Sequence, residues 1–169
     1  QPEVLRFWGR PRGELVTDTG ATEIIRNIQE RWMPFKERVD SLGFLRLERP
    51  TASGWSTKQM LAHVAFWDEA VEGAVLSLFR KLELPEGWRF GSGYRPDPGE
   101  WPSFEVHNAR EAEWAQRESS SEVIARLESA HAALLRFLET VTDSEAEEHA
   151  AYFADLGKHY DEHLRELLA

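Results

Sequence analysis

Two histidines near the end of the chain, His159 and His163, are four residues apart. On a helix, this spacing places both imidazoles on one face, one turn apart. Their nitrogens could bind one divalent metal ion together if a third ligand came from another helix. Such a pair alone, on a charged C-terminal helix, is more often two solvated histidines than a metal site. The metal hypothesis therefore depends on a third ligand.

His63 is the best candidate for that third ligand, although it could instead be a packed core histidine. It lies in a segment that begins with a capping box, in which Ser56 and Gln59 occupy the N-cap and N3 positions of a helix. Three histidine ligands leave coordination positions open for water or substrate, whose pKa a bound ion lowers. A zinc protease is excluded, because Tyr160 occupies the position where a His-Glu-x-x-His motif has its glutamate.

The apolar residues recur at three- and four-residue steps, which predicts helices and no strands. The expected helices span residues 19–42, 56–82, 103–117, 119–141 and 143–168. Four long helices and one shorter one predict an all-α four-helix bundle. Pro34 is expected to kink or break the first helix. We assign residues 1–16 to an N-terminal arm and residues 17–169 to the bundle domain.

A stretch rich in glycine, proline and aromatic residues, residues 85–102, separates the second long helix from the short one. Loops of this length are usually functional or disordered, and the aromatic residues favour an ordered, packed loop. We expect it to shape the access of substrate to the metal.

Three residues that share a predicted helix with a histidine could belong to a pocket. Trp67 follows His63 by one turn and Tyr152 precedes His159 by two turns, so both could line a pocket or serve as core aromatics. Asp68 lies on the apolar face of the second helix. It could orient a ligand histidine or simply mark the solvated edge of that helix.

Four further polar residues have weaker assignments. Asn108 and His107 follow the long loop and could reach the open face of the metal, although such residues are also common at exposed helix starts. His131 and His149 are expected at the surface.

Composition limits the class of function. The formal net charge of −10 opposes binding to nucleic acid, whose phosphates would be repelled. No apolar run approaches the roughly 18 residues that span a bilayer. Residues 1–16 lack the apolar core of a signal peptide, so a cytoplasmic location is expected. Aromatic residues in this arm suggest docking, which makes a homodimer plausible.

Several segments resemble the DinB/YfiT-like superfamily. The second-helix segment GWSTKQMLAHVAFW (54–67) is similar to a motif of that family, and so is the terminal pair within HYDEH (159–163). In the middle region, HNAR (107–110), SEV (121–123) and AHAAL (130–134) are also similar. Together the similarities run from about residue 22 to residue 168.

This resemblance implies a four-helix bundle in which His63, His159 and His163 bind a divalent metal, with Zn, Ni and Fe as candidates. It also implies a metal-dependent enzyme acting on a small molecule, plausibly a transferase or isomerase that uses a low-molecular-weight thiol. The alternative is a protein that binds or sequesters a small molecule or a metal without catalysis. No catalytic residue is identified by the sequence.

Overall fold

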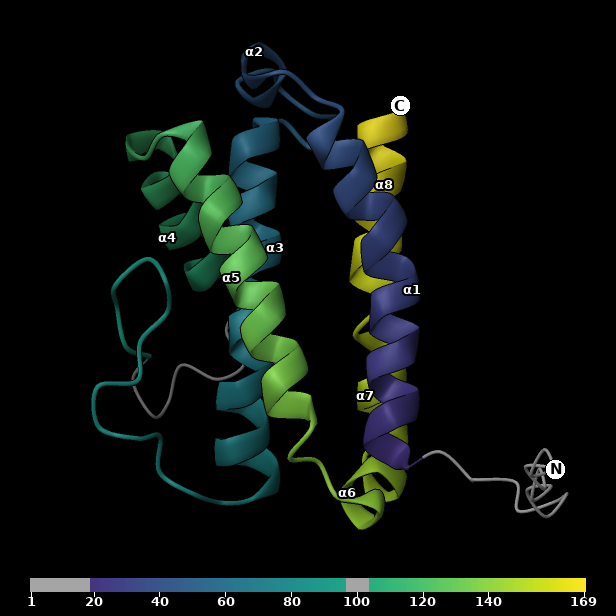
Figure 1. The fold of residues 1–169 in the computed structure, drawn as a ribbon. Helices are drawn as coiled ribbons and strands as arrows, with labels where there is room; N and C mark the ends of the chain where they lie inside the picture. The colour runs from purple at the N-terminus through teal and green to yellow at the C-terminus, as the bar shows by residue number, and fades with distance from the viewer. Residues whose placement is uncertain (1–18, 97–103) are drawn as a thin grey trace, which may run out of the picture.

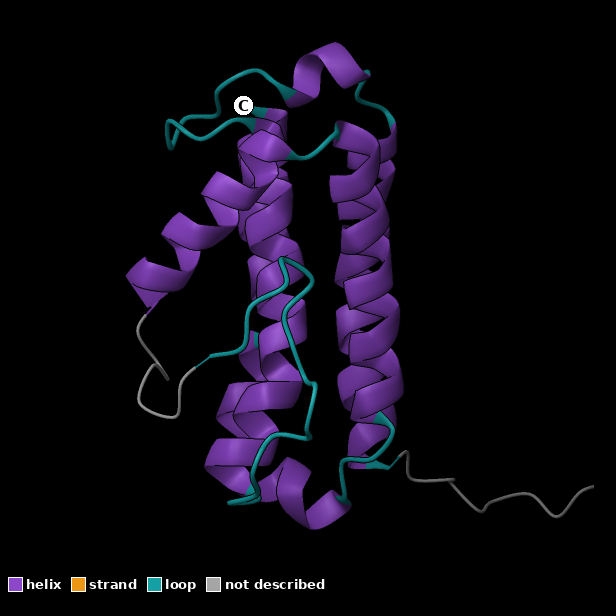
Figure 2. Cartoon of the chain, turned by 90° about the vertical axis from the view of Figure 1, so that its left-hand side faces the viewer, coloured by secondary structure: helices purple, strands orange, loops and turns teal. Residues whose placement is uncertain are grey.

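The structure is a computed structural model and describes residues 19–96 and 104–169. Its elements are α1 (Gly20–Asp40), α2 (Phe44–Leu47), α3 (Thr57–Ala74), the π-helical turn η1 (Val75–Phe79), α4 (Phe104–Arg117), α5 (Ser120–Leu138), α6 (Asp143–Glu148), α7 (Ala150–Asp155) and α8 (Lys158–Leu168). The described residues form no strand, only an isolated bridge between Pro50 and Ser56 (Figure 2). The predicted all-α class is confirmed.

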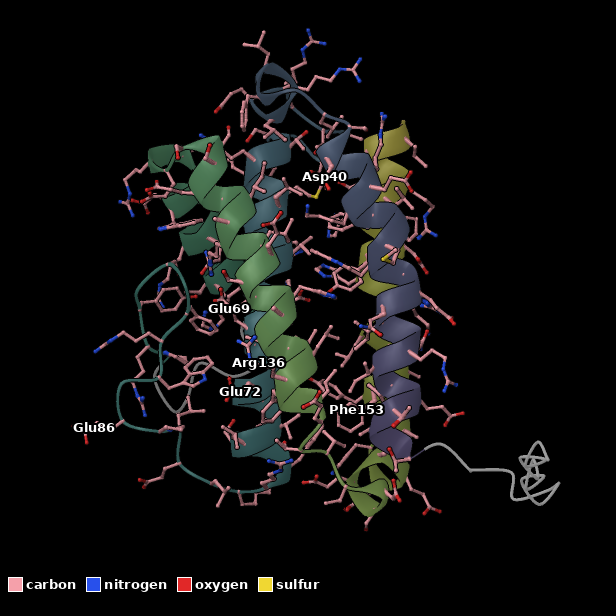
Figure 3. All side chains as sticks on the ribbon, in the orientation of Figure 1. Asp40, Glu69, Glu72, Glu86, Arg136 and Phe153 are labelled. Atoms are coloured by element: carbon pink, nitrogen blue, oxygen red, sulfur yellow. The ribbon has the colours of Figure 1, made fainter. Side chains whose placement is uncertain are left out.

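The long helices form two layers (Figure 1). In one layer α3 packs against α5 and α4, and in the other α1 packs along α8. Side chains from both layers fill the space between them (Figure 3). No helix in the described part of the chain is both long and apolar enough to cross a membrane.

The core between the layers is built from apolar side chains at helical spacing. Its fully buried members include Ile28, Phe35, Met60, Leu61, Val64, Val123, Leu127, Leu138 and Phe153. Burial of such side chains contributes about 1.5–3 kcal/mol each and fixes how the helices face one another. His63 is carried on α3 between these core positions, so its orientation is set by the same packing.

Local sequence signals place the helix starts correctly. Both reciprocal hydrogen bonds of the predicted capping box are present between Ser56 and Gln59, so α3 begins at Thr57. A second capping box joins Ser119 to Glu122 at the start of α5. Thr19 caps α1 through its side chain. The capping box of α3 fixes the register of the helix that carries His63, whereas α8, which carries His159 and His163, has no side-chain cap.

Two expected helix boundaries are wrong. Pro34 does not break α1, which runs unbroken from Gly20 to Asp40; the alternative, a kink at Pro34, stays a prediction. Pro34 lies on the exposed face, where water can bond the carbonyl of Glu30 that loses its backbone donor. The predicted last helix is instead three helices, separated at His149 and again at residues 156–157. At the second break Gly157 lies so close to Arg31 that a Cβ atom would approach its Cδ to 2.6 Å.

The N-terminal arm lies outside the described residues, as does the end of the long loop. The docking of the arm and the homodimer therefore stay predictions. In the described part of the loop the aromatic residues are packed, as expected: Phe90 is buried against Phe66, with Trp88 and Tyr94 beside it.

Candidate metal centre

The structure brings the three candidate ligands together although they are up to a hundred residues apart in the chain. His63 comes from the middle of α3, while His159 and His163 come from successive turns of α8. The Nε2 atom of His159 lies 3.0 Å from Nε2 of His63 and 3.0 Å from Nε2 of His163. When one ring nitrogen is taken from each of the three histidines, all three nitrogens lie within 4.8 Å of one another.

Burial keeps all three imidazoles neutral. It lowers the pKa of His63 and of His163 to about 4, and that of His159 to about 2. The neighbouring histidines lower the pKa of His63 and His159 further, because a second positive charge so close would be repelled. Neutral imidazole is the form that binds a metal, so protons do not compete for these nitrogens at neutral pH.

One hydrogen bond favours the tautomer that a metal ligand needs. The Nδ1 atom of His63 lies 2.9 Å from Oδ1 of Asn108, a carbonyl oxygen that accepts its hydrogen. The indole N–H of Trp67 also points at this Nδ1, at 3.2 Å, and could donate to it only in the opposite tautomer; the shorter contact favours Asn108. Nδ1 of His163 has no hydrogen-bond partner among the described residues, but the carboxylate of Glu166, at 3.4 Å, favours a hydrogen on it electrostatically. With hydrogens on both Nδ1 atoms, the Nε2 lone pairs of His63 and His163 face His159.

This arrangement fits a bound cation. The Nε2 of His159 can donate at most one hydrogen, so one of its two 3.0 Å contacts brings two lone pairs face to face. A metal ion between the nitrogens removes that repulsion. Two nitrogens at 2.0–2.1 Å from one tetrahedral zinc ion are about 3.3 Å apart. The observed spacing is close to this value, so the three residues need only small adjustments to share an ion.

A cavity of about 730 Å³ opens beside the cluster, with His63 and His159 in its wall. Trp67, Asp68 and Tyr152, three of the four predicted pocket residues, also line it. Asn108 does not; it contacts His63 from the α4 side. Nothing from residues 80–96 lines this cavity, so the described part of the long loop does not shape it, contrary to our expectation.

Comparison with known families decides the relationship of this chain. The family model of the DinB superfamily matches residues 23–168, which is most of the chain. The chain belongs to the DinB superfamily. The match includes all three histidines of the cluster. Comparisons with curated proteins and with solved structures returned no match.

In this DinB-superfamily bundle a second group of polar side chains crosses the core beside the histidines. The hydroxyl of Tyr160 donates a 2.6 Å hydrogen bond to Oδ2 of Asp68. It also lies 2.9 Å from Nδ1 of His131, which donates to it. The ring of Trp32 stacks on His131, with 3.8 Å between centroids. Residues from α1, α3, α5 and α8 therefore meet at one hydrogen-bonded group.

The contacts of four polar residues correct predictions made from the sequence. Asp68 neither orients a ligand histidine nor marks a solvated edge, because it is buried and bonded to Tyr160. His131 is only 6% exposed rather than at the surface. His149 is half-buried, with its ring stacked on Phe79. His107, which we expected near the metal, instead has its Nδ1 2.8 Å from the hydroxyl of Tyr94 and its ring against Phe66.

The described part of the long loop is fixed on the α4 side by buried charges. Arg126 of α5 pairs with Glu69 and Glu111. Glu69 also accepts a hydrogen bond from the backbone N–H of Gly91, on an oxygen that it shares with Arg126, and Glu111 accepts one from the hydroxyl of Ser92 on its other oxygen. Glu69 is labelled in Figure 3. Sequence reasoning did not predict this network, which anchors residues 91 and 92 of the loop on the α4 side.

The titration of Asp68 gives a test of the buried polar group. Burial raises the pKa of Asp68 to about 8, whereas its pKa in the unfolded chain is near 4. Between these two pH values the carboxyl group is protonated in the folded protein and ionised in the unfolded chain. The free energy of unfolding contributed by Asp68 must then fall as the pH rises from about 4 to about 8. In Asp68→Asn this contribution is absent.

The measurement is urea unfolding of the metal-free wild type and Asp68→Asn between pH 4.5 and 9. Because the histidines titrate in both proteins, the difference in stability isolates Asp68. We expect the wild type to lose stability relative to the variant up to about pH 8 and no further above it. A difference that is constant across this range would contradict the assignment.

Proposed function

We propose that this protein is a metal-dependent enzyme in which a divalent ion is held by Nε2 of His63, His159 and His163. One observation carries the proposal: three neutral imidazoles, two buried and one half-buried, converge beside a cavity large enough for a small-molecule substrate, with His63 and His159 in its wall. Zinc, nickel and iron all accept imidazole ligands, and the donor set is compatible with each of them.

The number of ligands favours a catalytic role over a structural one. Structural zinc sites are closed by four protein ligands, whereas catalytic sites use three and leave a position open. Within the described residues, the cluster contains three side chains. Asp68, the nearest candidate for a fourth ligand in the sequence, is engaged with Tyr160. This arrangement argues against the alternative of a closed, purely structural metal site.

We further propose that the reaction is a transfer or isomerisation that uses a low-molecular-weight thiol, as the family motifs imply. A bound divalent ion lowers the pKa of a thiol or water in its open position and so provides a nucleophile at neutral pH. Asn108 orients His63 through a hydrogen bond to its Nδ1, and the carboxylate of Glu166 lies 3.4 Å from Nδ1 of His163. Trp67 and Tyr152 line the cavity and exclude water from the substrate.

The test is the rate at which zinc-loaded protein consumes a small thiol together with an added electrophile, compared with the uncatalysed rate. We expect acceleration with the wild type and loss of at least tenfold in His63→Ala, because removal of one ligand weakens the site. His149→Ala is the matched control, since His149 stacks on Phe79 outside the cluster. Equal rates with and without protein would favour the non-catalytic binding protein.

A further inference from the structure

The cavity beside the histidines is elongated and follows the axis of α3. Its wall on that side is formed by residues about one helical turn apart, from His63 through Val71 and Ala74 to Leu78. These positions span about 20 Å at 1.5 Å per residue. The cavity therefore has a polar end at His63 and His159 and an apolar arm that runs away from it.

The arm contains no buried, unpaired charge that a substrate could bind. Its opposite walls come from Leu134 of α5 and from Leu156, at the end of α7. Apart from Asp68, the acidic and lysine side chains of the lining are exposed: Lys158, which pairs with Asp155 at 2.6 Å, and Glu162. The buried Asp68 is already bonded to Tyr160. Burial of a charged substrate group in this arm would have no compensation.

We propose that the substrate is an elongated amphiphile: an uncharged, apolar body fills the arm along α3, and one metal-binding head group lies at His63 and His159. The apolar character of the body follows from the cavity lining alone. The metal-binding head group rests on the proposed metal function. A volume of about 730 Å³ accommodates such a molecule, and burial of each methylene contributes about 0.8 kcal/mol. Affinity is therefore set mainly by the length of the apolar body.

The test is titration calorimetry of the protein with straight-chain alcohols from butanol to decanol. An alcohol does not need the metal, so this series probes the arm alone. We expect the dissociation constant to fall about fourfold with each added methylene until the arm is full. A dissociation constant that does not change with chain length would overturn the proposal.

Two variants locate the binding. Ala74→Trp fills the arm and is expected to remove the dependence on chain length, whereas Ala109→Trp on the exposed face of α4 leaves it unchanged. Leu78 is 41% exposed, so the fold tolerates a charge at this position. We expect Leu78→Asp to raise the dissociation constant for decanol at least tenfold. Leu45→Asp, at a site 86% exposed on α2, is its control. Unchanged decanol binding in folded Leu78→Asp would also overturn the proposal.

A parallel series of alkyl hydroxamic acids with zinc-loaded protein separates this inference from the metal function. We expect each hydroxamate to bind at least tenfold more tightly than the alcohol of equal length, and we expect His159→Ala to remove this advantage. If hydroxamates bind no more tightly than alcohols while affinity still rises with chain length, the proposed metal site is wrong and the proposed apolar body of the substrate is supported. If hydroxamates bind more tightly but affinity does not change with chain length, the proposed apolar body of the substrate is wrong.

Discussion

Zinc added to the metal-free protein is expected to raise its free energy of unfolding by about 4 kcal/mol when the free ion exceeds its dissociation constant a thousandfold. The reason is geometric. His63 on α3 and the pair on α8 belong to different layers of the bundle, so the ion joins the layers only when they are folded. For a chain of this size the melting temperature should rise by about 10 °C.

The controls follow from the positions of the histidines. His159 occupies the centre of the cluster, with Nε2 at 3.0 Å from both neighbours, so His159→Ala should abolish the zinc-dependent rise. His149→Ala should keep it, because that ring stacks on Phe79. Thermal melts with and without zinc, at equal protein concentration, provide the measurement. A rise of equal size in His159→Ala would mean that zinc stabilises the protein at another site.

Tyr160→Phe is expected to destabilise the metal-free protein by about 1–3 kcal/mol, because it leaves buried polar groups without partners. The lost hydroxyl bonds Asp68 and accepts from His131, and both side chains remain buried after the substitution. Tyr160 is itself 1% exposed, so water cannot replace the hydroxyl without disturbing the core. Urea unfolding at pH 7 provides the free energies.

Tyr152→Phe is the matched control for this change. Tyr152 also belongs to the C-terminal segment and lines the cavity, but its hydroxyl makes no hydrogen bond to the described residues. We expect its stability to stay within about 0.5 kcal/mol of the wild type. Equal effects of the two substitutions would show that the hydrogen-bonded group of Asp68, Tyr160 and His131 does not stabilise the fold.

The parts of the site that sequence reasoning predicted depend on local spacing. The capping box at Ser56 fixes where α3 begins, and helical periodicity then places His63 on the face toward the core. The four-residue spacing of His159 and His163 survives the breaks in the C-terminal segment, because both residues fall within α8. The fold class followed from the same periodicity.

The parts that were missed depend on contacts between distant elements. Nothing near His131 in the sequence shows that Tyr160 of α8 and Trp32 of α1 cover it. At the break, Gly157 lies against the side chain of Arg31 from α1, a contact that the sequence near Gly157 does not show. Glu166 is the exception, since its i,i+3 spacing from His163 was available as a signal for the carboxylate beside that histidine.

X-ray absorption spectroscopy of the zinc-loaded protein tests the central claim most directly, because it counts the ligands of the ion itself. The structure predicts three imidazole nitrogens at about 2.0–2.1 Å together with at least one exchangeable oxygen ligand. In His63→Ala the count should fall to two imidazoles with a much weaker affinity for zinc. A spectrum without imidazole ligands, or one that is unchanged in His63→Ala, would contradict the metal centre.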